Sequence, residues 1–419
     1  MSGAALRSAN GVDSSCAWQP SLHDLTLPEL RLAIGRGLVV FSFIWPFFNF
    51  DLIVPGNTME VNFLLVFVAA LILPEIFLED WQSIVFAVPA FLVGLIASGP
   101  TSCLRLIAAV VPLHFLFNLT RALRARGMEL IPARVAYRAL KIFVLFCAAQ
   151  TIQMRYFHLI PPLLSDVLVS IVPRYWTVPY DHLGVHGVQG WASEPSSAGL
   201  TTIAFALVAI HQKPELRWRV LAWMCALLLL NKSIYATILV ILLLVACLQS
   251  LRHKLAATLA LIPAGGLVAI YMVHSGRVAT LQENLLIDGF NSEANHELAR
   301  FVQILSPLQQ LPHIYKPVIL FGSWVMEPMG LLPLVLGYGS LFGALWLIYM
   351  LKKNFPIRQV RMRPFWLIAL FVLLFIASAD LICSIVALAV FLVPRSSDMR
   401  EEDKRQPGAN FLQPIAEAL

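Results

Sequence analysis

Long apolar runs separated by short polar links constrain this chain more than any other feature. Hydrophobic residues make up 59% of its 419 residues and charged residues only 13%, whereas about 25% of a soluble domain is charged. A lipid bilayer is the solvent that accommodates so much apolar surface. The sequence therefore predicts an all-α fold, a polytopic transmembrane bundle of about ten to twelve helices. With a window of about 19 residues, the candidate helices fall near 36–54, 61–78, 82–99, 104–120, 138–154, 197–211, 217–231, 233–249, 255–273, 330–351 and 364–393.

The two ends of the chain are polar. Residues 1–35 form an N-terminal segment without the apolar core of a cleavable signal peptide, and residues 395–419 form a polar C-terminal tail. Residues 36–394 are expected to form a single transmembrane domain. The last apolar run, 364–393, is interrupted at 378–380. It reads either as one tilted helix or as a pair of short helices, so the side on which the C-terminus lies stays open.

Basic residues give the predicted bundle an orientation. Strict alternation of the helices puts every link that is rich in Lys and Arg on one side, together with Arg31 and Arg36; these links are 121–138, 212–219, 252–254 and 352–363. The opposite links, 55–60 and 100–103, contain neither residue type. Because cytoplasmic links carry the excess of Lys and Arg, the N-terminus is expected in the cytoplasm. Among the cytoplasmic links, only the acidic turn Glu79-Asp80 lacks basic residues.

The same alternation places two long loops, 155–196 and 274–329, on the outer side. Both loops are enriched in histidine, and they also hold Arg174, Arg277 and Arg300. Arginines that persist against the positive-inside bias are candidates for binding an anion, bidentately where the anion is a phosphate. The outer side has no DxD or HExxH motif and no acidic cluster. Chemistry without a bound metal ion or other cofactor is therefore expected.

The most informative stretch is 180–199, which carries the candidate site residues Tyr180, His182, His186, Gln189, Trp191 and Glu194. Its glycines permit tight backbone turns. Glu194 directly precedes the next predicted helix, where the helix dipole favours an acidic residue. The same carboxylate could also accept a proton from a substrate hydroxyl, and His186 is the alternative base. Both the structural and the functional interpretation of Glu194 fit the sequence.

The segment Gly190-Trp191-Ala192-Ser193-Glu194-Pro195-Ser196, followed by a helix of small residues, resembles the "G…EPS" segment of the bacterial O-antigen and exopolysaccharide polymerases (Wzy-like). The O-antigen ligases are relatives of these enzymes. Three later features continue the resemblance: the polar turn Asn231-Lys232-Ser233, Arg277 in the second outer loop, and Leu336-Gly337-Tyr338-Gly339 entering a late helix. One feature departs from it. The family commonly has an arginine shortly before the glycine and glutamate, where this chain has His186 and Gln189.

The resemblance implies a multi-pass glycosyltransferase of the bacterial inner membrane that acts in exopolysaccharide or lipopolysaccharide biosynthesis. Its substrate would be a glycan on undecaprenyl pyrophosphate, extended at the periplasmic face. Arg174, Arg277 and Arg300 would bind the pyrophosphate, and Glu194 or His186 would act as the base. The remaining substrate-binding candidates are Tyr180, His182, Gln189 and Trp191. Membrane lipids and a chain-length-regulating membrane protein are the expected partners; nucleic acid is not, because the basic residues cluster between apolar runs.

Two alternatives stay open. An O-antigen ligase would share the same features, because the identity of the acceptor depends on the shape of the loops. A secondary transporter or lipid-glycan flippase belongs to another class, which predicts ionisable residues near the bilayer midplane and two related halves. Few such residues and no internal repeat occur here, which favours the enzyme. His114, inside the run 104–120, is expected to form hydrogen bonds between helices.

Overall fold

The computed structural model describes about half of the chain in detail. The described residues are 26–45, 61–156, 188–192, 195–231, 233–248, 331–354, 369–370, 372–376 and 381–393, with the single positions Gly266, Ile270 and Val273. Every element formed by these residues is a helix, and none is a strand. The prediction of an all-α fold is therefore confirmed for this part of the chain. The predicted helix 255–273 lies outside it, apart from the three single positions.

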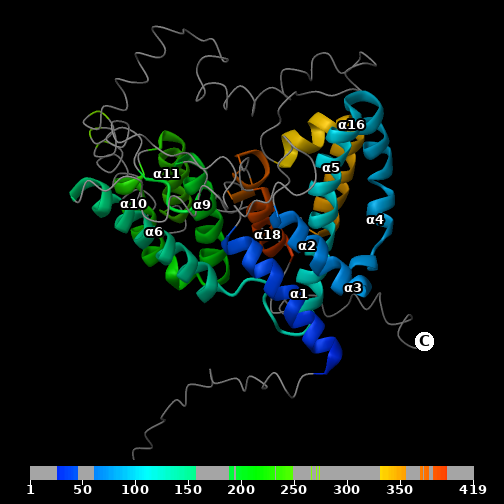
Figure 1. Cartoon of the computed structure of the whole chain (residues 1–419), viewed down its shortest axis with the longest axis horizontal. Coiled ribbons are helices and arrows are strands. Elements are labelled where there is room, and N and C mark those ends of the chain that lie inside the picture. The colour runs from blue at the N-terminus through cyan, green and yellow to red at the C-terminus, as the bar shows by residue number, and fades with distance from the viewer. Residues whose placement is uncertain are drawn as a thin grey trace, which may run out of the picture.

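The helices form two groups on either side of a central helix (Figure 1). α18 lies between them, contacts α5 on one side and α9 on the other, and is buried along residues 382–393. One group holds α6, α9, α10 and α11, and the other holds α3, α4, α5 and α16. The elements are α1 (Leu27–Ile44), α2 (Val61–Ile72), α3 (Pro74–Leu78), α4 (Gln82–Val85), α5 (Val88–Ala125), α6 (Ala133–Tyr156), α9 (Pro195–Gln212), η2 (Pro214–Leu216), α10 (Arg217–Leu230), α11 (Ile234–Leu248), α16 (Leu331–Asn354), the π-helical turn η4 (Val372–Ile376) and α18 (Leu381–Leu392).

The first helix begins nine residues before the apolar run that predicted it. The backbone N–H and the hydroxyl of Thr26 both donate to the Glu29 carboxylate, at 2.9 and 2.8 Å. With Pro28 in the first turn, this arrangement is a capping box that starts α1 at Leu27. A hydropathy window does not register such a polar helix start, so the predicted start at residue 36 was wrong.

Two of the predicted membrane helices, 61–78 and 82–99, are broken, and the predicted change of direction between 82–99 and 104–120 is present. The predicted helix 61–78 ends as α2 at Ile72 and resumes as α3 at Pro74, because proline has no backbone N–H to continue the first helix but suits the first turn of the next. The predicted helices 82–99 and 104–120 correspond to α4 and the two limbs of α5, which reverse direction at Gly99 (φ 83°). A Cβ atom on Gly94 would lie 3.8 Å from the Cα atom of Cys103, so the two limbs pass close to each other.

Polar contacts gather several links at one end of the bundle, which we call the basic end. Its contacts join Arg31 to Ile72 and Glu75, Arg36 to Leu130, Gln212 to Glu129, Arg124 to Val390, and both Arg121 and Lys353 to Asp80. Because the carbonyl of Val390 accepts from Arg124 at 2.7 Å, α18 ends at the basic end. Within the run 364–393 the structure describes two separate elements, η4 and α18. This arrangement favours the pair of short helices over one tilted helix.

The opposite end, which we call the loop end, collects the last turns of α6 and α10 and the first turns of α9 and α11. α6 starts beside the basic end and is about 36 Å long at 1.5 Å per residue, so its last turns lie far from Glu129. The backbone N–H of Val188 donates to the carbonyl of Leu230 at 3.1 Å and ties the segment 188–192 to the end of α10.

Two of the described helices are long and apolar enough to cross a membrane. These spans are Cys103–Ala125, with 23 residues, and Ala133–Gln153, with 21 residues. Five shorter apolar helices accompany them in the described part of the chain: Asn62–Ile72, Gln82–Ile96, Ser197–Gln212, Ala236–Val245 and Ile382–Leu392. The larger set of membrane crossings that the hydropathy pattern predicts stays a prediction.

Candidate functional site

The segment 188–192, which we call the platform, holds the first three residues of the resemblance motif. The side-chain amide of Gln150 on α6 binds the backbone of Gly190 twice: its Nε2 donates to the Gly190 carbonyl at 3.2 Å, and its Oε1 accepts from the Gly190 N–H at 3.0 Å. Gly190 has φ 65°, in the left-handed region that favours glycine. A Cβ atom there would lie 2.8 Å from Phe143 Cζ and 3.0 Å from Cys147 Sγ. Only glycine therefore fits this position.

Trp191 is held in an aromatic cluster rather than on an open surface. Its ring stacks on Trp45 with centroids 5.4 Å apart and planes 7° apart, and it meets Phe143 edge-on at 4.6 Å and Phe146 at 5.6 Å. Only 5% of Trp191 is exposed, and Gln189 is buried as well. The platform thus brings together two predicted substrate-binding residues, Gln189 and Trp191, and seats them against α1 and α6.

Small residues let the first turns of α9 and α11 approach each other closely at the loop end. A Cβ atom on Gly199 would lie 2.5 Å from the Cβ atom of Ala236, so glycine is needed for the contact. The Asn231 Oδ1 atom accepts from the backbone N–H of Ser233 at 2.9 Å and shapes the turn that leads into α11. The described motif residues on both sides of Glu194 therefore share the loop end with Asn231 and Ser233 of the polar turn.

The other predicted site residues lie outside the described part of the chain. They are Arg174, Tyr180, His182, His186, Glu194, Arg277 and Arg300. Their roles stay predictions from the sequence. The described ends of α6 and α9 fix where the first outer loop leaves and rejoins the bundle: at the loop end in both cases.

The glycine-rich stretch 336–339 lies inside α16, although the sequence predicted it at the start of a late helix. A Cβ atom on Gly343 would collide with the carbonyl oxygen of Val335. In a straight helix two residues eight positions apart are separated by about 12 Å, so α16 bends sharply here. Tyr338 within this bend is buried, and its hydroxyl accepts from Arg105 on α5 at 2.9 Å. Arg105 lies about 24 Å along the helix axis from Arg121 and is an arginine at the loop end that the sequence analysis missed.

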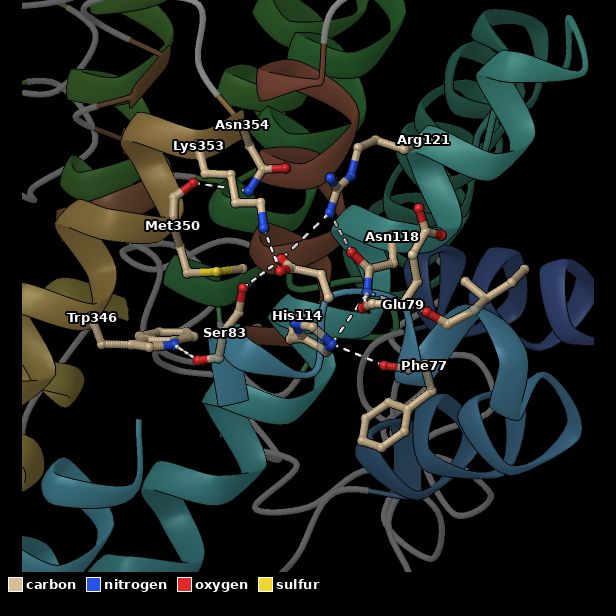
Figure 2. A network of polar contacts seen from close by, with 12 residues as sticks. Phe77, Glu79, Ser83, His114, Asn118, Arg121, Trp346, Met350, Lys353 and Asn354 are labelled. Carbon is tan, nitrogen blue, oxygen red and sulfur yellow. Dashed lines mark hydrogen bonds and ion pairs between the residues drawn. The ribbon is translucent and has the colours of Figure 1, made fainter. Parts of the chain in front are cut away.

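A second polar cluster, centred on Asp80, lies at the basic end. Figure 2 shows the side chains of Ser83, His114, Asn118, Arg121 and Lys353 converging there from α4, α5 and α16. Lys353 pairs with one Asp80 oxygen, while Arg121 lies 3.9 Å from the other and the Ser83 hydroxyl donates to it at 2.5 Å. The acidic turn therefore has two basic partners, which α5 and α16 supply from distant links. Because the link itself contains no Lys or Arg, this basic support could not be predicted from its composition.

The same cluster satisfies the backbone carbonyls that the broken helix leaves free. Asn118 Nδ2 donates to the carbonyls of Ile76, at 3.2 Å, and Glu79. Trp346 Nε1 donates to the Ser83 carbonyl at 2.9 Å. The His114 Nε2 atom lies 2.9 Å from the Phe77 carbonyl. A carbonyl only accepts, so this nitrogen carries the proton. The prediction that His114 forms hydrogen bonds between helices is confirmed.

The charge partners of Asp80 control its protonation. Burial raises the pKa of the Asp80 carboxyl, but the hydrogen bonds from Lys353 and Ser83 and the charges of Lys353 and Arg121 outweigh burial and hold the pKa below its ordinary value of 3.8. The folded chain thus favours the carboxylate more than the unfolded chain does. The resulting stability is fully present above the ordinary pKa and is lost as pH falls through the lower folded value.

We expect Asp80→Asn to flatten the loss of stability in acid. The melting temperature of the wild-type chain in detergent should fall more steeply than that of the variant once the pH drops below about 4. Glu215→Gln is the matched control, because the Glu215 side chain is 82% exposed and pairs only loosely with Lys213 at 3.7 Å. Parallel acid profiles for the wild type and Asp80→Asn would contradict a stabilising carboxylate.

Within the described part of the chain, no group of three or more His, Cys, Asp or Glu residues is placed to hold a metal ion. Comparison of the chain with protein-family models, with curated proteins and with solved structures finds no match.

Proposed function

We propose that this protein is a multi-pass enzyme of the bacterial inner membrane that polymerises glycan repeat units carried on undecaprenyl pyrophosphate. The observation that carries the proposal is the platform. The Gly190-Trp191 motif is fixed by Gln150 and by an aromatic cluster at the loop end, directly before α9. Glu194 follows the platform by two residues in the sequence and directly precedes α9, which makes it the carboxylate of this proposal.

The contacts at the basic end support the proposed topology. Links that alternation assigns to the cytoplasm meet one another there: Arg36 reaches Leu130, Gln212 reaches Glu129, and Lys353 reaches Asp80. The platform lies at the other end of α6. If the basic end faces the cytoplasm, as the positive-inside rule requires, both outer loops face the periplasm, where the lipid-linked glycan is extended.

The proposed reaction needs a base and an anion-binding group. Glu194 or His186 accepts the proton of the acceptor sugar's hydroxyl as its oxygen attacks the anomeric carbon of the donor glycan. The bond between that carbon and the pyrophosphate oxygen breaks, and the electron pair leaves with undecaprenyl pyrophosphate. Arg174, Arg277 and Arg300 would stabilise the developing negative charge on this leaving group, as fixed cations do in other transfer reactions. The glycan grows by one repeat unit.

The test is the glycan ladder of a strain that lacks the gene. We expect the wild-type chain to restore long polymer, and Glu194→Gln and Arg277→Ala each to leave single repeat units, a loss on the order of 100-fold or more for a base or an oxyanion partner. Glu215→Gln and Arg219→Ala, at the basic end, are controls of the same chemistry and should make polymer normally. Long polymer from both site variants would contradict these roles. Long chains that remain on the lipid carrier in the deletion strain would indicate the O-antigen ligase.

One observation favours the transporter or flippase as a second candidate. Helices α2, α3 and α4 form a discontinuous membrane segment beside ionisable residues, the arrangement in which transporters bind their substrates. Here, however, the side chains of Asn118, His114 and Trp346 bind the backbone carbonyls freed by the breaks. These carbonyls therefore already have partners within the protein and are not left for a substrate. Flux of a lipid-linked glycan across proteoliposomes that contain only this chain would establish the transporter class, and its absence beside an active ladder would exclude it.

A further inference from the structure

Four buried polar atoms at the loop end have no hydrogen-bond partner among the described residues. They are the indole Nε1 atoms of Trp45 and Trp191 and both amide atoms of Asn62. Asn62 is fully buried, and Trp191 is 5% exposed. Buried polar groups are nearly always hydrogen-bonded, and buried indole N–H groups usually find an acceptor. Such atoms, which we call the polar nest, need an explanation.

The residues of the nest, rather than its four atoms individually, are brought together by two contacts, one of which involves the backbone of Asn62. The Trp45 and Trp191 rings are stacked with centroids 5.4 Å apart. Ser42 lies three residues before Trp45, or about one helical turn, and its hydroxyl reaches the Asn62 carbonyl at 3.4 Å. The nest therefore lies where the end of α1, the start of α2 and the platform meet. The Trp45 residue as a whole is only partly buried, whereas its Nε1 atom, like the other three atoms of the nest, is buried.

Comparable groups elsewhere in the described chain are satisfied in full or in part: Asn354 keeps the hydrogen bond of its Nδ2 atom, although its Oδ1 atom has no partner. Trp346 Nε1 donates to the Ser83 carbonyl at 2.9 Å, and Trp223 Nε1 donates to the Tyr137 hydroxyl at 3.2 Å. Asn118, as deeply buried as Asn62, uses both of its amide atoms. The contrast within one chain points to a ligand at the nest, because a buried amide that served only for packing would be expected to find partners in the fold.

We propose that the polar nest binds one sugar unit of the glycan, a neutral ligand rich in hydroxyl groups. A hydroxyl both donates and accepts, so sugar hydroxyls can accept from the two indole N–H groups and from the Asn62 amide nitrogen, and can donate to the Asn62 oxygen. All four atoms belong to neutral groups, which suits an uncharged ring better than a phosphate. That the sugar belongs to the lipid-linked glycan rests on the proposed polymerase function; the existence of the site rests on the unpartnered atoms alone.

The variants remove the polar atoms and keep the volume. Trp191→Phe and Trp45→Phe delete an indole N–H while an aromatic ring remains, and Asn62→Leu replaces the amide by an apolar group of similar size. Because these atoms make no hydrogen bond within the described protein, we expect none of the three changes to lower the melting temperature through a lost hydrogen bond. Trp346→Phe is the control: it removes a satisfied indole at the basic end and should lower stability without affecting sugar binding.

The full chain in lipid nanodiscs is probed by saturation-transfer NMR with the methyl glycosides of common hexoses and N-acetylhexosamines. We expect at least one glycoside to receive saturation from the wild type and from Trp346→Phe. Asn62→Leu and Trp191→Phe should bind it about tenfold more weakly, the effect of losing one or two neutral hydrogen bonds. No signal with any glycoside, or equal signals from all variants, would overturn the proposal and leave only water at the nest.

The glycan ladder separates the two proposals. Sugar contact at the nest in a chain whose deletion leaves the ladder unchanged would support the site and reject the polymerase. Polymer of normal length from all three nest variants, with no sugar contact in the wild type, would reject the site and leave the polymerase standing.

Discussion

Replacing Asn118 with leucine is expected to lower the free energy of unfolding by about 3 kcal/mol, because it leaves buried polar groups without partners. Asn118 Nδ2 donates to the carbonyls of Ile76 and Glu79, and its Oδ1 accepts from Arg121 at 2.5 Å. Leucine keeps much of the volume and removes all three bonds. Each buried carbonyl then loses a partner at about 1–3 kcal/mol, partly offset by the apolar contacts that leucine gains.

Asn62→Leu is the matched control for this prediction. Both asparagines are fully buried, and both lie in apolar helices, but the Asn62 amide has no partner among the described residues. The same substitution is therefore expected to be neutral or stabilising at Asn62. Chemical unfolding of the detergent-solubilised chain measures both. Equal effects of the two substitutions would mean that the Asn118 hydrogen bonds contribute no net stability.

The hydrogen bonds of Asn118 explain how the chain tolerates a broken helix. The break at Leu73–Pro74 and the Glu79-Asp80 turn leave backbone carbonyls without a helical partner, and a buried carbonyl needs one. Arg31 covers the carbonyl of Ile72, and Asn118 covers those of Ile76 and Glu79. The polar residues within the apolar runs thus replace the hydrogen bonds that an unbroken helix would make for itself.

The sequence predicted the helices that proline or a polar turn delimits. The structure has α9 at 195–212, α10 at 217–230 and α11 at 234–248, each within two residues of the prediction. Pro195, Pro214 and Asn231 mark these limits, since proline favours a first turn and asparagine favours turns. The break at Leu73 was missed because a window of about 19 residues averages across a short interruption.

The polar contacts between distant helices could not be predicted from one sequence. Lys353 and Asp80 are far apart in the chain, and Gln150 lies 40 residues before Gly190. A hydropathy scale assigns each of these residues a value by its type. It carries no information about which two helices pack together. A weaker signal did exist: Gln150 and Asn118 are polar residues within apolar runs, and such residues need a partner.

Gly190→Ala is expected to lower the free energy of unfolding by about 3–4 kcal/mol and, under the proposed function, to abolish polymer. A non-glycine residue in the left-handed region costs about 1–2 kcal/mol, and forcing a methyl group into a packed core adds about 1–3 kcal/mol. The methyl group would press on Phe143 Cζ at 2.8 Å and on Cys147 Sγ at 3.0 Å, and both of these side chains are fully buried. Because Trp191 follows directly and packs on the same Phe143, the displacement reaches the aromatic cluster and the start of α9.

Gly127→Ala separates backbone strain from steric collision. Gly127 has a similar φ of 71°, but a Cβ atom there meets nothing within 4 Å. Its substitution should therefore cost only the backbone term, about 1–2 kcal/mol, and should leave the glycan ladder unchanged. The comparison is made by chemical unfolding and by the ladder in the deletion strain. If both alanine variants lost the same stability, packing of Gly190 against α6 would contribute nothing. If Gly190→Ala lost stability but still made long polymer, the position of the platform would not matter for the reaction.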